Sequence, residues 1–375
     1  MTRTIIDISL LQTVPPSNIN RDDTGSPKTA IFGGVRRARV SSQAWKRATR
    51  LDFAGRLNRD ELGERTKRVV EVVTERVLAA EADVDPEAAR TVVESIFKAA
   101  GIKVTAPKKP ENAPAESGYL LFLSNQQSQH LAEVAVAALR SDEPDAVIKA
   151  AAPKKILAST HSVDIALFGR MIAEDTSLNV DAAVQVAHAI SVHAVNTEFD
   201  YFTAVDDVKS SAEGEDNSGA AMIGTVEFNS STLYRYATVD VDRLLDNLGD
   251  VEATRRAVTA FVESFVRSMP TGKQNTFANR TLPEGVVISV RDSQGINLVG
   301  AFERPIEQDR VAGSSAALRD YSIEVDANYG TAPVISWVVQ TGAATEPLRE
   351  LGTKSSLDEA IVALGDVVAE RIAGV

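Results

Sequence analysis

The chain opens with an apolar segment that favours a β-strand. Apolar side chains dominate residues 4–11, and the pair Pro15 and Pro16 is expected to end the strand. A polar loop follows, and after it come a short extended piece at residues 30–32 and a turn at Gly33 and Gly34. The first part of the chain is therefore predicted to contribute strands to a sheet.

A short amphipathic helix follows these strands and is predicted from Gln43 to about Phe53. Ser41 or Ser42 has the side chain expected of its N-cap. The expected apolar stripe consists of Ala44, Trp45, Ala48 and Leu51. Basic residues gather on the other side at helical spacing: Lys46, Arg47 and Arg50. Just before the helix, Arg37 and Arg39 stand two residues apart and would share one face of a strand.

From about residue 57 to residue 157 the pattern changes to helical periodicity. Three segments read as amphipathic helices, at residues 62–82, 91–102 and 128–140. Between the last two lies a Pro-rich loop that carries Lys108 and Lys109. We interpret this block as a helical insertion in an α/β body, while an independent helical domain is the alternative.

The second half of the chain is predicted to mix strands and helices. We expect a strand at residues 161–172 and a helix at residues 180–193. Two β-rich arms, residues 196–207 and 222–241, flank a very polar segment and predict a long, projecting hairpin. A helix at residues 250–268, a loop leading into a strand at residues 270–292 and a last helix after Ser355 complete the expected elements.

Charge is distributed very unevenly along the chain. The net charge of the 375 residues is -12, which alone would argue against a nucleic-acid partner. However, residues 24–51, which we call the basic strip, contain seven basic residues and no acidic one. The remaining residues carry 33 basic and 52 acidic groups. This segregation predicts a polyanion-binding surface in one place, and a basic face without a partner is the alternative.

The sequence offers little for catalytic or metal chemistry. It contains no cysteine, which excludes disulfides and thiolate metal sites and fits a cytoplasmic setting. No run of about 18 apolar residues predicts a membrane span. Nucleotide-binding glycine loops and the nucleophile elbow are also missing. His188 and His193 would lie about 140° apart on the predicted helix and could not share a ligand. We therefore expect no metal and no cofactor.

Asp22 and Asp23 form the one carboxylate pair beside the basic strip. Such a pair could hold a divalent metal against a phosphodiester. The alternative, which we favour, is a turn in which an Asp side chain accepts backbone N–H groups.

Several segments together resemble the CasC family, the repeated backbone subunit of the type I-E CRISPR complex Cascade. The longest runs from Asn20 to Arg50 (NRDD…AIFGGVRRARVSSQAWKRATR). Shorter ones follow in order: VDIALFGRM at 163–171, AHAISVHAV at 187–195, DYFTAVDD at 200–207, LYRYATVDVDRLLDNLG at 233–249 and GKQNTFA at 272–278. The resemblance implies an α/β (α+β) fold with an RRM-like (ferredoxin-like) palm, a helical fingers insertion and a β-hairpin thumb. It places the palm at residues 1–54, 159–199 and 231–375, the fingers at 55–158 and the thumb at 200–230.

The same resemblance implies a non-catalytic protein that polymerises along the spacer of a crRNA. Base pairing with the target DNA strand then reads the sequence, while the protein grips the RNA backbone. Other partners would be further copies of the chain, the other Cascade subunits and, transiently, a helicase-nuclease. Phosphates would be held in the palm by Arg21, Lys28, Arg37, Arg39, Ser41, Gln43, Lys46 and Arg50.

A second group of residues is implied at the thumb and around the groove. Phe202, Thr203 and Met171, next to Arg170, would wedge against a displaced base, although core packing is the alternative for Phe202 and Met171. Lys273, Gln274 and Asn275 would complete the groove. Two other functions remain open: a type III-like ribonuclease that uses Asp22 or Asp23, and an α/β enzyme whose arginines clamp a small acidic metabolite.

Overall fold

The computed structural model describes residues 3–107, 113–204 and 222–373. The chain divides into two compact units, which are described separately. Unit 1 comprises Met1–Leu51, Val186–Thr238 and Val262–Leu364. Unit 2 comprises Asp52–Gln185, Val239–Phe261 and Gly365–Val375. Unit 2 contains the whole of the predicted helical insertion, within its first segment, and two further segments.

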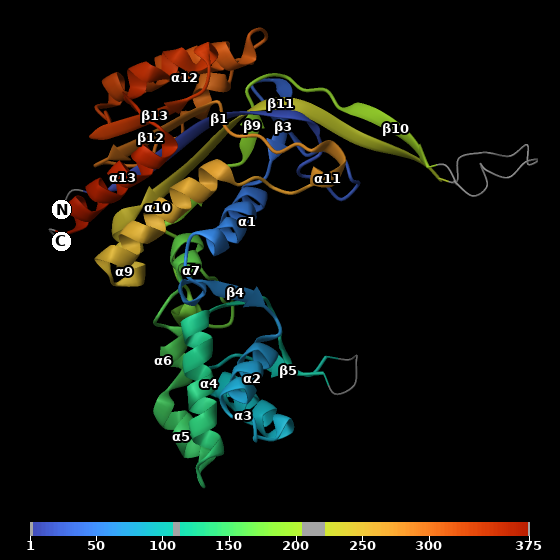
Figure 1. Cartoon of the computed structure of the whole chain (residues 1–375), viewed down its shortest axis with the longest axis vertical. Coiled ribbons are helices and arrows are strands. Elements are labelled where there is room, and N and C mark those ends of the chain that lie inside the picture. Colours follow the sequence, from blue (N-terminus) through green and yellow to red (C-terminus); the bar gives the residue numbers. More distant parts are fainter. Residues whose placement is uncertain (1–2, 108–112, 205–221, 374–375) are drawn as a thin grey trace, which may run out of the picture. The chain divides into compact units, whose positions relative to one another are not determined.

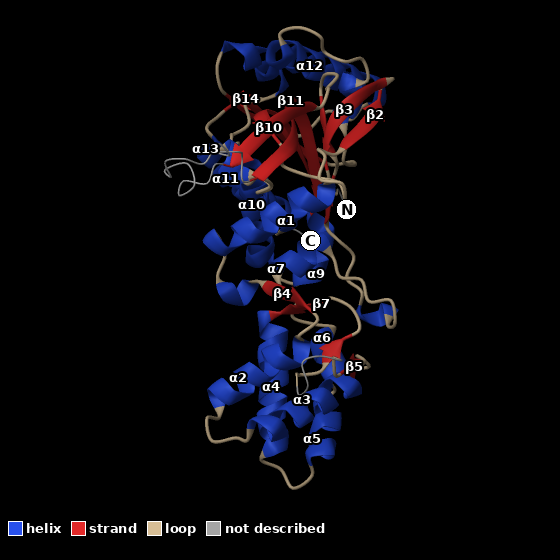
Figure 2. Ribbon diagram, turned by 90° about the vertical axis from the view of Figure 1, so that its right-hand side faces the viewer, coloured by secondary structure: helices blue, strands red, loops and turns tan. Residues whose placement is uncertain are grey.

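Unit 1 is built on a large sheet, drawn in red in the upper part of Figure 2. Its strands follow in space the order β14 (Thr353–Lys354), β13 (Ile335–Gln340), β12 (Gly285–Arg291), β1 (Ile5–Ser17), β11 (Met222–Asp240), β9 (Ala189–Ser191), β3 (Val35–Val40) and β2 (Thr29–Phe32). Two more strands, β8 (Val184–Val186) and β10 (Glu198–Ala204), also pair with β11. The first strand, β1, thus lies in the interior of the sheet, between β12 and β11.

Helices cover both faces of this sheet. They are α1 (Ser42–Asp52), α10 (Val251–Arg267), α11 (Gln274–Phe277), α12 (Arg310–Tyr329) and α13 (Leu357–Ile372), and the division into units falls within α10 and α13. Side chains of β11 alternate between the faces. Tyr234 and Tyr236 pack in a core with Leu318 of α12. Arg235 contacts the rings of Trp45 in α1 and Phe265 in α10. Helices α1 and α12 therefore pack on opposite faces (Figure 1).

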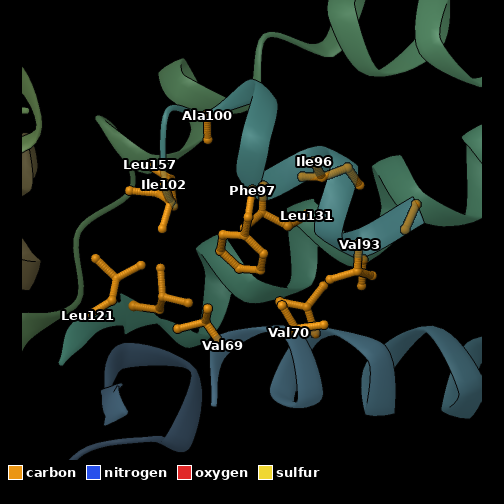
Figure 3. Packing of buried hydrophobic residues seen from close by; sticks show 14 of the residues in the cluster. Val69, Val70, Val93, Ile96, Phe97, Ala100, Ile102, Leu121, Leu131 and Leu157 are labelled. Carbon is orange, nitrogen blue, oxygen red and sulfur yellow. The ribbon is translucent and has the colours of Figure 1, made fainter. Parts of the chain in front are cut away.

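Unit 2 is mainly helical. Its helices are α2 (Val69–Ala80), α3 (Pro86–Ala99), α4 (Asn125–Leu139), α5 (Pro144–Ala151), α6 (Pro153–Leu157), α7 (Val163–Phe168) and α9 (Val241–Leu248). Two small sheets pair β4 (Gly63–Thr66) with β7 (Leu121–Ser124), and β5 (Val104–Thr105) with β6 (Glu116–Ser117). Figure 3 shows how Phe97 of α3 packs with Val70 of α2 and Leu131 of α4 in the core of this unit.

The ends of these helices follow from local side-chain chemistry. Asp85 caps α3 by accepting the backbone N–H of Ala88, at 3.0 Å. Ser124 and Gln127 form a capping box at the start of α4, in which each side chain accepts the backbone N–H of the other residue. The three helices predicted in the insertion are thereby confirmed as α2, α3 and α4. The first prediction began too early, because residues 63–66 form the strand β4.

Three expectations about the elements were wrong. Residues 161–172 contain the short helix α7 instead of a strand. The predicted helix at residues 180–193 is instead two short strands, β8 and β9, because β9 fills the place between β11 and β3 and takes its hydrogen bonds from both. Strand β1 continues through Pro15 and Pro16 to Ser17. Its pairing with β12 ends at Leu11, so the two prolines interrupt no hydrogen bond of that ladder.

The long hairpin is confirmed in the described residues. β10 and β11 pair antiparallel, from Glu198 opposite Phe228 to Ala204 opposite Met222, and extend as a two-stranded ribbon (Figure 1). The polar segment between the arms lies outside the described residues. None of the helices in the described part of the chain is long and apolar enough to cross a membrane.

Candidate nucleic-acid interface

The basic strip occupies β2, β3 and α1 in unit 1. Five of its cations have no ion pair with a carboxylate in the described part of the chain: Lys28, Arg36, Arg39, Lys46 and Arg47. The guanidinium of Arg39 is held at one point only, where its Nε donates to the carbonyl oxygen of Thr29 at 3.2 Å. This surface of unit 1 thus presents positive charge that no described acidic side chain neutralises.

Helix α1 is fixed in place by its cap and by its buried face. Ser41 is its N-cap: its Oγ accepts the N–H of Ala44 at 3.3 Å, and its own N–H donates to Oδ1 of Asn20 at 2.8 Å. Trp45 and Thr49 are the buried residues of the helix. The guanidinium carbon of Arg235 lies 3.6 Å from the centroid of the Trp45 ring. This packing differs from the predicted stripe, because Leu51 is 55% exposed.

The face of α1 beside this packed side presents the predicted pair. Lys46 and Arg50 stand one turn apart and both are half-buried. Burial lowers the pKa of the Lys46 ammonium, which has no hydrogen bond or ion pair to another described residue. Gln43 is exposed in the first turn. Ser41 is buried and its hydroxyl oxygen caps the helix, so its predicted contact with phosphate is replaced by a structural role.

The prediction that Arg37 holds a phosphate is wrong. Its side chain is fully buried, and its guanidinium donates to four backbone carbonyl oxygens, those of Phe32, Ser191, Phe302 and Glu303, at 2.8–3.1 Å. All three nitrogens are therefore occupied, and Arg37 joins β3 to two distant segments of unit 1. Strand spacing placed Arg37 and Arg39 on one face, but it could not tell that this face is covered at Arg37.

The loop at residues 19–25 forms a second part of the surface. Asp22 closes it as a turn: Oδ1 accepts the backbone N–H groups of Thr24 and Ser26, both at 3.0 Å. The hydrogen bond from the Thr24 hydroxyl, followed by these backbone bonds, lowers the pKa of the Asp22 carboxyl. The favoured interpretation of this carboxylate is thus confirmed. Among the described residues, no group of three or more His, Cys, Asp or Glu side chains could hold a metal ion.

The chain segment with Lys273, Gln274 and Asn275 lies against this loop. A Cβ atom on the preceding residue, Gly272, would stand 2.3 Å from the carbonyl oxygen of Ile19, so only glycine permits this approach. Gly272 and Arg21 both line an open hollow of about 530 Å³. The structure thus brings two predicted groups together, Arg21 in the loop and the segment that begins at Lys273.

A residue that the sequence did not single out as functional, His188, lies at the start of α1. Its Nδ1 accepts the backbone N–H of Ser42 at 3.0 Å, which leaves the proton of a neutral ring on Nε2. Burial lowers the pKa of His188, and the charges of Arg39 and Lys28 lower it further. The exposed imidazole therefore adds a neutral donor beside two cations. The sequence analysis missed His188 because it predicted a helix at residues 180–193, and its place beside α1 depends on the strands that form there instead.

The hairpin carries aromatic side chains on both of its faces. Phe202 is 37% exposed, and its ring lies over Gly224, where a Cβ atom would stand 2.5 Å from the ring. Phe199 and Tyr201 alternate with it, and both are mostly exposed. Thr203 is exposed next to Phe202. Core packing is therefore wrong as the alternative for Phe202.

Unit 2 holds the two remaining predicted residues, and they differ sharply. Met171 is 81% exposed, which is unusual for a large apolar side chain and also excludes core packing. Arg170 is buried and donates to the carbonyl oxygens of Leu178 and Leu157 at 3.0 and 2.6 Å, with longer bonds to Phe122 and Gln127. It is a structural residue of unit 2, which corrects its predicted place in the site. Lys108 and Lys109 lie outside the described residues.

Comparisons with known proteins agree with one another. A family model described as "CT1975-like protein" matches residues 6–363. A chain of a solved "CRISPR RNA-guided surveillance complex, pre-nicking" is 33% identical, with a TM-score of 0.81 and coverage of 96% of this chain and 100% of that one. A chain of another "CRISPR RNA-guided surveillance complex" is 30% identical, with a TM-score of 0.72 and coverage of 97% and 99%. A search of curated proteins found no match.

Proposed function

Because the chain belongs to the CT1975-like family, we propose that it is the guide-RNA-binding backbone subunit of a CRISPR surveillance complex of the type I-E Cascade kind. In this role it holds and shapes a crRNA and catalyses no reaction. The observation that carries the proposal is the set of cations just before β2, on β3 and on α1 that have no carboxylate partner among the described residues, on a chain with a net charge of -12. A polyanion is the natural partner of such a surface.

The strand order of unit 1 supports an RRM-like palm. Strands β12, β1, β11 and β9 are neighbours in that order, and in the chain they follow as β1, β9, β11 and β12. Helix α1 comes after β1, and α10 comes between β11 and β12. This is the β-α-β-β-α-β arrangement of a ferredoxin-like fold. In the proposal, unit 2 supplies the fingers between α1 and β9, and the β10–β11 hairpin is the thumb.

The proposed RNA contacts are those that the structure leaves accessible. Phosphates are held by Arg21, Lys28, Arg39, Lys46 and Arg50, with Gln43 and the segment Lys273, Gln274 and Asn275 beside them. Phe202 and Thr203 press against a displaced base, and Met171 offers a second apolar surface. Stacking of a base on such side chains is independent of sequence, as a carrier of arbitrary guides requires. Arg37, Arg170 and Ser41 act by holding the fold.

The proposed partners follow from this role. Further copies of the chain bind along the same crRNA, and the target DNA strand is recognised by pairing with the presented bases. Other Cascade subunits and a transient helicase-nuclease complete the system, in the cytoplasm. The deciding experiment is co-expression with the neighbouring genes and a CRISPR array, followed by purification through a tag on this chain. We expect co-purified crRNA of uniform length, whereas a complex without RNA would overturn the proposal.

A further inference from the structure

A small hollow opens in unit 1 between β1, β3, β11 and the residues just before β2. Its lining includes two cations, Lys28 and Arg39, and two polar residues of β11, Asn229 and Ser231. The free volume inside is about 20 Å³, which is enough for one water molecule or for one oxygen of a larger ligand. No acidic side chain lines it. The hollow therefore lies within the proposed RNA-binding surface and carries its positive charge.

Asn229 is the unexplained residue of this hollow. It is 8% exposed, and its Nδ2 is buried without a hydrogen-bond partner in the described part of the chain. Ser231, two residues on and 5% exposed, lines the same hollow. Buried polar groups in folded proteins almost always have partners. A buried amide donor without one, on a residue that lines the hollow, points to an acceptor that comes from outside the chain.

The surroundings indicate what kind of acceptor this is. Lys28 and Arg39 offer only donors and positive charge, and no carboxylate of the lining competes for them. Near the same two cations, whose charges act on its ring, the Nε2–H of His188 is a further neutral donor. A set of charged and neutral N–H donors without an acidic residue matches an oxyanion. The oxyanion available on a guide RNA is its phosphodiester group.

We propose that Asn229, with Lys28 and Arg39, forms a site for a phosphodiester oxygen of the bound RNA, and that Asn229 supplies its neutral, buried donor. The proposal rests on the function proposed above and extends it to a residue of β11 outside the basic strip. Lys28 and Arg39 attract the phosphate, while the amide in the hollow fixes where one of its oxygens sits. The site would thus set the register of the RNA backbone on the sheet.

The test measures binding of the full chain to a short single-stranded RNA, by fluorescence anisotropy across a series of chloride concentrations. Asn229→Asp keeps the size of the side chain and replaces the donor with a negative charge. We expect its affinity to fall at least tenfold, with a salt dependence that is shallower by about 0.7 for each phosphate that the variant no longer neutralises. Asn229→Ala should bind about tenfold more weakly with an unchanged salt slope, because a neutral donor releases no counterion.

Two controls separate binding from folding. Lys28→Ala should reduce the salt slope like Asn229→Asp, and Asn229→Ser provides a second small side chain without the amide donor. Unfolding in urea should be similar for all variants and the wild type. If all three Asn229 variants unfold more easily and keep the RNA affinity of the wild type once folded, Asn229 is purely structural and the proposal fails.

The ligand is identified by parallel measurements with single-stranded DNA of the same sequence and with inorganic phosphate. Equal fold-losses on RNA and DNA support a phosphate oxygen, whereas a loss confined to RNA would make the ribose hydroxyl the ligand and overturn the assignment. A response to inorganic phosphate with unchanged RNA affinity would also overturn it. If the wild type binds RNA and the Asn229 variants bind it equally well, this site fails and the proposed function stands. If the wild type binds no RNA, both fail.

Discussion

The basic strip of unit 1 and part of the surface of unit 2 differ in how their charged side chains are paired. On unit 2, cations meet carboxylates: Arg243 lies 3.0 Å from Asp181, Arg256 lies 2.7 Å from Glu61, and Lys154 lies 2.5 Å from Asp175. On the basic strip of unit 1, five cations lack such partners among the described residues. The units share one chain and one solvent, so the difference is local. It separates cations that already have a carboxylate partner from cations that have none among the described residues.

The energetics show why such a surface can persist without its ligand. An exposed ion pair contributes only about 0–1 kcal/mol, so leaving a surface cation unpaired costs the fold little. A bound polyanion is different, because every neutralised phosphate also releases counterions and thereby adds to affinity. Unpaired cations therefore matter mainly for binding, and paired ones mainly for local structure. Changes of equal charge in the two units should then have unequal effects.

The largest expected effect comes from reversing charge on α1. Lys46→Glu with Arg50→Glu should weaken RNA binding by about a hundredfold or more, because two phosphate contacts become repulsive. The matched control is Arg90→Glu with Lys98→Glu on α3 of unit 2, which makes the same change in net charge. RNA affinity at moderate salt measures both variants. Equal losses would show that net charge, and not the strip, governs binding.

The next effect distinguishes two arginines of the strip itself. Arg37→Met should destabilise unit 1 by about 3 kcal/mol, because it leaves four carbonyl oxygens without their donor, two of them in buried bonds and two in part-buried bonds. Arg39→Met should change stability little and weaken RNA binding instead. Urea unfolding and RNA affinity, measured on both variants, give the two readouts. If Arg37→Met weakened RNA binding without a loss of stability, Arg37 would be an RNA contact and not a structural residue.

A smaller effect compares the two faces of the hairpin. Phe202→Ala should cost about 1–3 kcal/mol of RNA binding, the usual range for a base stacked on an aromatic ring. Tyr201→Ala is the matched control, because Tyr201 is more exposed and points to the opposite face. Neither should change the unfolding of the chain, which urea titration checks. Loss of affinity in Tyr201→Ala alone would assign the base contact to the other face.

Sequence patterns predicted local features well and long-range placement poorly. The cap at Ser41, the turn at Asp22 and the arms of the hairpin all depend on neighbours in the chain, and all were predicted. The burial of Arg37 depends on Ser191 and Phe302, more than 150 residues away. Strand β9 likewise owes its form to pairing with β3 and β11. Asn229 and His188 could not be assigned to the site from the sequence, because their positions depend on these distant partners.

The comparison of the units extends to the smallest expected effect, a dependence of stability on pH that starts in unit 2. Burial, and then the charge of Arg170, lowers the pKa of His161 to about 4. The unfolded chain takes up this proton near the ordinary value of 6.5, so the folded chain should be fully stable above that pH. Stability should then fall as pH decreases toward about 4, by about 1–2 kcal/mol for a partly exposed ring.

His161→Gln is the variant that isolates this contribution, because the amide can keep a contact with Gln127, whose Nε2 lies 3.4 Å from Nδ1 of His161. Urea unfolding across this pH range should show a shallower dependence in the variant. Some dependence should remain, since burial also lowers the pKa values of His188 and His193 in unit 1. An unchanged slope would mean that protonation of His161 makes no contribution to acid stability. The charge of the buried Arg170 would then have no effect on stability through the pKa of His161.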